Sequence, residues 1–181
     1  MAPDLIVPGE SPAIVSVMIE VELLGVKVEV PSNTPVVAMR ELGGRRRSLS
    51  IFIGAPEATA IAFALEGVET PRPLTHDLLK DVIDKLDVSV ERVVVTELRD
   101  TTFFAELHLV ALGETHVVSS RPSDAVALAA RVDCPIFVED DVLDAAGVVD
   151  ENDHAAAPDA EVVVEEFRQF IENINPDDFA S

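Results

Sequence analysis

The sequence predicts an α+β fold, in which a mostly antiparallel sheet packs with helices and a C-terminal amphipathic helix follows. Two observations lead to this class. Strand-like segments, in which apolar and polar residues alternate, come in groups separated by helical segments, in the order β-β-β-α-α-β-β-β-α. The connections within each group are short. Because hairpin-like connections join antiparallel neighbours, we expect antiparallel pairing rather than a doubly wound parallel sheet.

The first three strand segments carry clear bulge and turn signals. Alternation begins near residue 18 and changes phase across Leu24-Gly25, which predicts a bulge or bend there. Residues 36–40 and 48–53 then predict a hairpin whose turn contains two glycines. The same turn carries the basic cluster Arg45-Arg46-Arg47. Two interpretations of this cluster are open, a solvated hairpin tip or a contact for a phosphate group.

Helical periodicity follows the hairpin. The first predicted helix begins near Gly54, carries Pro56 in its first turn and ends at Gly67. Thr75 is the expected N-cap of the second helix. The expected inner face of that helix consists of aliphatic residues, namely Leu78, Leu79, Val82, Ile83 and Leu86. Further strands are predicted at 90–98, 102–110, 115–119 and 135–138, and further helices at 122–132 and 140–146.

These elements divide the chain into three parts. Residues 1–17 contain three prolines and no regular period, so we expect a loose leader. Residues 18–147 form the predicted domain. Residues 148–181 are predicted to contain an acidic linker and then a helix with an apolar stripe at Val163, Phe167, Phe170, Ile171 and Ile174.

The charge balance is strongly acidic. The chain has 13 Lys and Arg residues against 34 Asp and Glu residues, a net charge of −21. Residues 139–181 alone hold one basic and 14 acidic residues, a net charge of −13. Such a chain repels phosphate backbones at long range, so binding of nucleic acid would need a local basic patch or bridging cations. The small number of lysines fits either a high-salt cytoplasm or an ordinary acidic protein.

The sequence favours a cytoplasmic location and no association with a membrane. No apolar run is long enough to span a bilayer, and the N-terminus lacks the positive region of a signal peptide. The lone Cys134 cannot form an internal disulfide bond.

Two similar motifs stand where predicted helices begin, and they carry the candidate functional residues. One is the segment from Arg72 to Asp77, and the other is the segment from Arg121 to Ala125. Each combines an arginine and a proline with a hydroxyl and a carboxylate. One interpretation is structural, because hydroxyls can cap helices, carboxylates can face helix dipoles and arginines can tie the helix starts together.

The other interpretation is catalytic and requires the two helix starts to meet in space. Asp77 and Asp124, together with Glu57, could then hold a divalent cation, Mg²⁺ or Mn²⁺, through oxygen ligands. In this hypothesis the catalytic residues are His76, Asp77, Arg121 and Asp124, and the substrate-binding residues are Arg72 and Ser123. His76 or a metal-bound water would act as base on a phosphodiester, and an arginine would stabilise the developing charge.

Several segments in order resemble one known family. They are Gly54-Ala55-Pro56-Glu57-Ala58, Arg72-Pro73-Leu74-Thr75-His76-Asp77-Leu78-Leu79, Phe103-Phe104-Ala105-Glu106-Leu107, Arg121-Pro122-Ser123-Asp124-Ala125 and Pro135-Ile136-Phe137-Val138. Over roughly residues 18–147 the chain is similar to the bifunctional nuclease (BFN) family, formerly an uncharacterised domain family of bacteria, archaea and plants. The acidic end, Pro176-Asp177-Asp178-Phe179, also resembles tails of some prokaryotic members. The resemblance implies a compact α+β domain that is often oligomeric and a nuclease acting on RNA and DNA.

Two functional hypotheses therefore stand beside each other. The first is a nuclease that hydrolyses phosphodiester bonds in RNA or DNA, with a divalent cation as candidate cofactor and a homo-oligomeric assembly. The second is a non-enzymatic ligand-binding or oligomerisation module, in which the same motifs serve as helix caps and apolar surfaces meet partner subunits.

Overall fold

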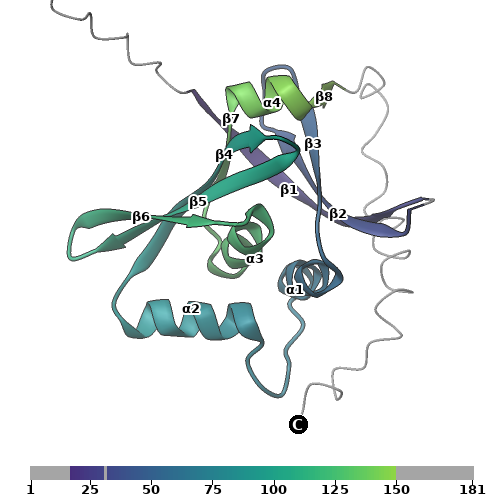
Figure 1. The fold of residues 1–181 in the computed structure, drawn as a ribbon. Helices are drawn as coiled ribbons and strands as arrows, with labels where there is room; N and C mark the ends of the chain where they lie inside the picture. The colour runs from purple at the N-terminus through teal and green to yellow at the C-terminus, as the bar shows by residue number, and fades with distance from the viewer. Residues whose placement is uncertain (1–16, 31, 150–181) are drawn as a thin grey trace, which may run out of the picture.

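The structure, a computed structural model, describes residues 17–30 and 32–149 (Figure 1). Its strands are β1 (Met18–Glu29), β2 (Thr34–Glu41), β3 (Arg47–Phe52), β4 (Ser89–Arg99), β5 (Thr102–Ala111), β6 (Glu114–Ser120), β7 (Ile136–Glu139) and β8 (Val148–Val149). Its helices are α1 (Ala55–Glu66), α2 (Thr75–Lys85), α3 (Pro122–Val132) and α4 (Asp140–Ala146). The predicted leader, apart from its last residue, and the predicted C-terminal helix lie outside the described residues.

The described strands form one sheet in the order β6-β5-β4-β7-β1-β2-β3-β8. Neighbouring strands are antiparallel except for β4 and β7, which are parallel. The predicted α+β class with a mostly antiparallel sheet is therefore confirmed. The predicted bulge is also present, because the pairing of β1 with β2 shifts register between Leu23 and Gly25. Gly25 has a φ of 132°, which a side chain would disfavour.

Helices α1, α2 and α3 lie on one side of the sheet, and α4 lies near β8 (Figure 1). The central helix is α3, which packs against α1, α2, β4 and β5. Small residues along α1 and α3, such as Ala58 and Ala129, allow this close packing and are almost fully buried. Larger aliphatic side chains of the sheet, among them Val37, Met39 and Leu49, complete the core.

The predicted inner face of α2 is wrong for every residue except Ile83. Leu78, Val82 and Leu86 are 56%, 46% and 68% exposed, and only His76 and Ile83 of this helix are buried. Because α2 packs mainly on α3, the domain covers only one edge of its apolar stripe. Periodicity locates an apolar face, but it does not reveal whether the same chain covers that face. The predicted N-cap is also wrong by one residue, since Leu74 is the N-cap and Thr75 is the first helical residue.

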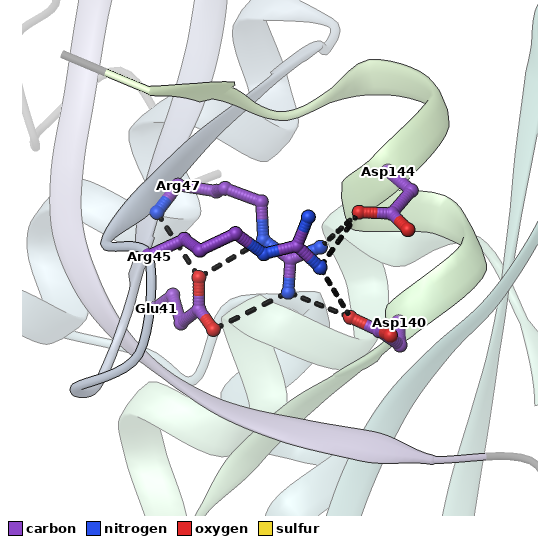
Figure 2. A network of polar contacts seen from close by, with 5 residues as sticks. All are labelled: Glu41, Arg45, Arg47, Asp140 and Asp144. Carbon is purple, nitrogen blue, oxygen red and sulfur yellow. Dashed lines mark hydrogen bonds and ion pairs between the residues drawn. The ribbon is translucent and has the colours of Figure 1, made fainter. Parts of the chain in front are cut away.

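The arginine cluster of the first hairpin is neither a fully solvated tip nor an open phosphate contact. Arg47 is 3% exposed and donates hydrogen bonds to Glu41, Asp140 and Asp144 (Figure 2). The Nη atoms of Arg47 lie 2.7 Å from Asp140 and 2.6 Å from Asp144. The exposed Arg45 pairs with the same two aspartates. Arg45 and Arg47 therefore bind the hairpin to α4 through ion pairs. These two segments are far apart in the sequence.

Strand β8 ends the described part of the chain. Val148 and Val149 pair with Ser48 and Arg47 of β3, although the sequence suggested that a linker begins at residue 148. Among the described residues, no helix is both long enough and apolar enough to cross a membrane.

Candidate functional site

Each of the helices α1, α2 and α3 carries an acidic residue at the third helical position. These residues are Glu57, Asp77 and Asp124. The first turn of a helix has backbone N–H groups without helical partners and the positive end of the helix dipole, so carboxylates are favourable there. Propensity alone explains why all three are acidic, and their different partners decide what each can do.

Arg121 joins two of these helix starts. It is the N-cap of α3, and its guanidinium lies 2.7 Å from Asp124 and 2.9 Å from Glu57 of α1. Gly54 gives Glu57 room, because a Cβ at that position would come within 2.2 Å of the Glu57 carboxylate. The side chain of Arg121 is 66% exposed, so its guanidinium remains accessible to a ligand. Its hydrogen bonds to Asp124 and Glu57 raise the pKa of the Arg121 guanidinium.

His76 extends this network to α2. Its Nε2 atom lies 3.0 Å from Asp124 Oδ1, although the two residues are 48 positions apart. Burial alone would raise the pKa of the Asp124 carboxyl, but hydrogen bonds from Arg121 and His76 outweigh burial and lower it. Since an ionised carboxylate only accepts hydrogen bonds, Nε2 of His76 must donate to Asp124. In the tautomer with its proton on Nε2, Nδ1 carries the free lone pair.

We call Glu57, Arg121, Asp124 and His76 the N-terminal network, because each lies at or near a helix N-terminus. The structure brings together these four predicted residues from three helices. The two distant helix starts therefore meet, as the catalytic interpretation requires. In this network the Asp124 carboxylate orients the His76 imidazole, and the Arg121 guanidinium lies beside them. Such an arrangement is suited to acid–base chemistry on an anionic substrate.

Asp77 faces a different partner. Its carboxylate accepts hydrogen bonds from the Leu74 backbone N–H at 2.8 Å and from Arg131 Nε at 2.5 Å. Burial would raise the pKa of the Asp77 carboxyl, but the bonds from Arg131 and Leu74 lower it overall. Arg131 is itself buried and also donates to the carbonyl oxygens of Ala60 and Ala127. These bonds tie α1, α2 and α3 together, and they support the structural interpretation for Asp77.

The remaining predicted substrate residues lie apart from the network. Arg72 is exposed and forms no ion pair with any residue of the described ranges. Ser123 is buried, and its hydroxyl does not cap α3. Neither side chain is positioned by the contacts that hold Arg121 and His76.

The predicted metal ligands do not form a cation site in this arrangement. Within residues 17–30 and 32–149, no three His, Cys, Asp or Glu side chains are grouped to hold a metal ion. Glu57 and Asp124 are already bridged by Arg121, and Asp77 is turned to Arg131. A divalent cation would have to displace a guanidinium to reach these oxygens. The roles of the three residues as metal ligands stay a prediction.

Sequence reasoning missed the structural roles of two buried arginine side chains, Arg131 and Arg47. Arg131 interrupts an otherwise apolar helical segment, and a lone charge in such a segment is a signal of a buried pair. The basic cluster drew attention to Arg47, but no local signal indicated its burial, because its partners on α4 follow more than ninety residues later. The partner of Arg131, Asp77 of α2, is also distant, 54 residues earlier in the sequence.

The fold and the N-terminal network define an α+β domain with a histidine–carboxylate–arginine site, and comparisons with known proteins place it in a family. The family model for the bifunctional nuclease domain matches residues 37–151. Uncharacterised proteins from two strains of Mycobacterium tuberculosis are 46% identical over 163 residues, covering 88% of this chain and 97% of theirs. The chain belongs to the bifunctional nuclease domain family, and the resemblance noted in the sequence is confirmed.

Plant relatives carry the nuclease name. Bifunctional nuclease 2 of Arabidopsis thaliana is 32% identical over 111 residues, which is 60% of this chain and 33% of the plant protein. The chain thus corresponds to about a third of the length of that plant protein.

Proposed function

We propose that this protein is a nuclease that hydrolyses phosphodiester bonds in RNA, in DNA or in both. The observation that carries the proposal is the N-terminal network, in which residues from three helices meet around Asp124. Membership of the bifunctional nuclease domain family supports the reaction class.

In the proposed reaction, a water oxygen forms a bond to phosphorus while the bond from phosphorus to the leaving oxygen breaks. Nδ1 of His76 takes the proton of the attacking water, because Nε2 is engaged with Asp124. The Asp124 carboxylate then stabilises the imidazolium. His76 finally gives the proton to the leaving oxygen, so the ring returns to its neutral form.

Arg121 has the electrostatic role in this proposal. Its exposed guanidinium can contact two non-bridging phosphate oxygens and stabilise the charge that develops on them. A phosphate must compete for Arg121 with Glu57 and Asp124, and the net charge of −21 opposes the approach of a polyanion. Added salt screens that long-range repulsion, so we expect cleavage to tolerate salt better than in a basic nuclease.

The test is cleavage of fluorescent RNA and single-stranded DNA by the full chain in Mg²⁺, in Mn²⁺ and in EDTA, over a range of salt concentrations. Asp124→Asn and His76→Gln should each lower the cleavage rate by about 100-fold or more. Asp141→Asn is the matched control, because it removes an exposed α4 carboxylate that pairs with no residue in the described ranges.

The possible results separate the parts of the proposal. Cleavage that survives both Asp124→Asn and His76→Gln would remove the site assignment. No cleavage of either substrate under any condition would remove the nuclease proposal. Cleavage that continues in EDTA would support a base mechanism through His76, and cleavage lost in EDTA would support the predicted divalent cation.

A second proposed property is self-association through α2. Leu78, Val82 and Leu86 form an exposed aliphatic stripe, and a stripe on one helix can pair with its own copy about a two-fold axis. Light scattering coupled to gel filtration should show a dimer or larger assembly that Val82→Glu dissociates. Leu112→Glu is the control, because Leu112 is fully exposed in the turn between β5 and β6. A monomeric native protein, or equal dissociation by both variants, would refute this interface.

A further inference from the structure

A hollow of about 560 Å³ lies against β1 and β3, away from the N-terminal network. It is lined by Lys27, Ser48, Ser50, Ala146, Val148 and Val149. Its size is that of sites that hold small organic ligands. None of its lining residues belongs to the site described above, so it needs its own explanation.

The strand register explains where the hollow opens. Val37 pairs with Val26 and Ile51, and all three are buried in the core beneath the helices. Successive residues of a strand point to opposite faces, so Ala38 and Ser50 face the other side of the sheet. On that side the cross-strand partners of Ala38 are Gly25 and Ser50.

Small residues lie next to the hollow, because Ala38 pairs with its lining residue Ser50 and with Gly25. Gly25 and Ala38 lie in the middle of this part of the sheet, and a Cβ added to Gly25 would meet no atom within 4 Å. Larger side chains flank them, since Lys27 pairs with Val36 on one side and Glu22 pairs with Arg40 on the other.

Three polar groups of the hollow have no side-chain partner among the described residues. The Lys27 ammonium and the hydroxyls of Ser48 and Ser50 form no side-chain hydrogen bond or ion pair within the described part of the chain. Glu22 is engaged by Arg40 at 2.6 Å, and Glu29, which follows on the same face of β1, forms no ion pair with Lys27. An unpaired ammonium is unexpected in a chain of net charge −21.

These groups suit a phosphate, and the rest of the hollow suits an organic group. A lysine ammonium beside two hydroxyl donors can satisfy several phosphate oxygens at once. A phosphate alone would fill only a small part of the volume. Ala146, Val148 and Val149 supply an apolar wall against which a ring or hydrocarbon part could pack.

We propose that this hollow binds a small phosphomonoester that carries an organic ring, the chemical class to which nucleoside monophosphates belong. Lys27 and the two serines hold the phosphate, and the α4–β8 segment contacts the organic part. The site is independent of the proposed cleavage reaction, because it shares no residue with the N-terminal network. Binding must therefore persist in Asp124→Asn, whether or not that variant cleaves nucleic acid.

The test is calorimetric titration of the full chain with adenosine monophosphate, adenosine and inorganic phosphate, supported by amide chemical shifts from NMR. Lys27→Gln should weaken binding of the monophosphate by about tenfold or more. Ala146→Leu should also weaken it, because the larger side chain of this lining residue fills part of the hollow without changing any charge. Lys85→Gln is the matched control, since it removes an exposed lysine charge on α2.

The expected result is measurable binding of the monophosphate, weaker binding of adenosine and phosphate, and loss only in Lys27→Gln and Ala146→Leu. Shifts should centre on β1, β3 and β8. No binding of the monophosphate would overturn the proposal. Equal weakening by Lys27→Gln and Lys85→Gln would also overturn it, because the attraction would then be a general charge effect.

Discussion

Two arginines of this protein have similar partners and opposite surroundings. Arg121 contacts two carboxylates and is 66% exposed, whereas Arg47 contacts three carboxylates and is 3% exposed. Every side-chain nitrogen of Arg47 has a protein partner (Figure 2). Hydrogen bonds from Arg47 lower the pKa of the Glu41 carboxyl although burial opposes this.

The difference teaches that an arginine–carboxylate cluster does not by itself indicate a site. Exposed ion pairs contribute little to stability and are weakened by salt, so they can exchange partners with a ligand. Buried ion pairs cannot be opened without leaving a charge in the interior. We therefore propose substrate contact for Arg121 alone, whereas the buried contacts of Arg47 give it a structural role.

The largest expected effect is the loss of stability that Arg47→Met should cause. This change leaves Glu41, which is 5% exposed, without its main partner. We expect the free energy of unfolding in urea to fall by about 3–5 kcal/mol. Arg45→Met is the control, because this exposed arginine pairs with the same aspartates and should cost less than about 1 kcal/mol. Similar losses for the two variants would contradict the comparison.

A double replacement sharpens this prediction. In Glu41→Met with Arg47→Met, both buried charges are removed, so much of the lost stability should return. A double variant as unstable as Arg47→Met alone would show that packing, rather than an unpaired charge, causes the loss.

The second largest expected effect is the loss of cleavage rate that Arg121→Gln should cause. Loss of a group that stabilises developing charge typically costs a factor of about 100 to 1,000 in rate. The free energy of unfolding should change by less than about 1 kcal/mol, because the ion pairs of Arg121 are solvent-exposed. Cleavage rates and urea unfolding are measured on the same preparation. A large loss of stability with unchanged cleavage would assign Arg121 to the framework instead.

The sequence predicted much of the local structure and part of the site. The phase change at Leu24-Gly25 located the bulge, and Gly67 marked the end of α1. The motif at Arg121 predicted the start of α3, because Pro122 and Asp124 favour a first helical turn. These features depend on neighbours in the sequence, which is why periodicity and capping rules could find them.

Local sequence rules could not predict contacts between residues that are distant in the sequence. Asp77 and Asp124 occupy the same helical position, yet Asp77 meets Arg131 while Asp124 meets His76. Only the packing of α2 on α3 decides between these partners. For the same reason, the stripe of α2 was correctly predicted as apolar but wrongly as buried.

A third prediction separates Asp77 from Asp124. Asp77→Asn removes the charge that holds Arg131, so unfolding should become easier by about 1–3 kcal/mol. Cleavage should remain near the native rate once the variant is folded, because the hydrogen bonds of the Asp77 carboxylate go to Leu74 and Arg131, outside the N-terminal network. Thermal unfolding and cleavage assays check both expectations. A loss of cleavage as large as that of Asp124→Asn would instead support the predicted catalytic or metal-binding role of Asp77.

The smallest expected effect is the contribution of Asp124 to acid stability. Its folded-state pKa is lowered, so its contribution is present above the ordinary carboxyl pKa of about 4 and is lost as the pH falls through the folded value. The stability difference between the native protein and Asp124→Asn should therefore shrink as the pH falls from 7 towards about 3. We expect a difference below about 1 kcal/mol at neutral pH, because Asp124 is partly exposed. Urea unfolding at several pH values measures it, and a difference that grows on acidification would show that the contacts of Asp124 favour its protonated form.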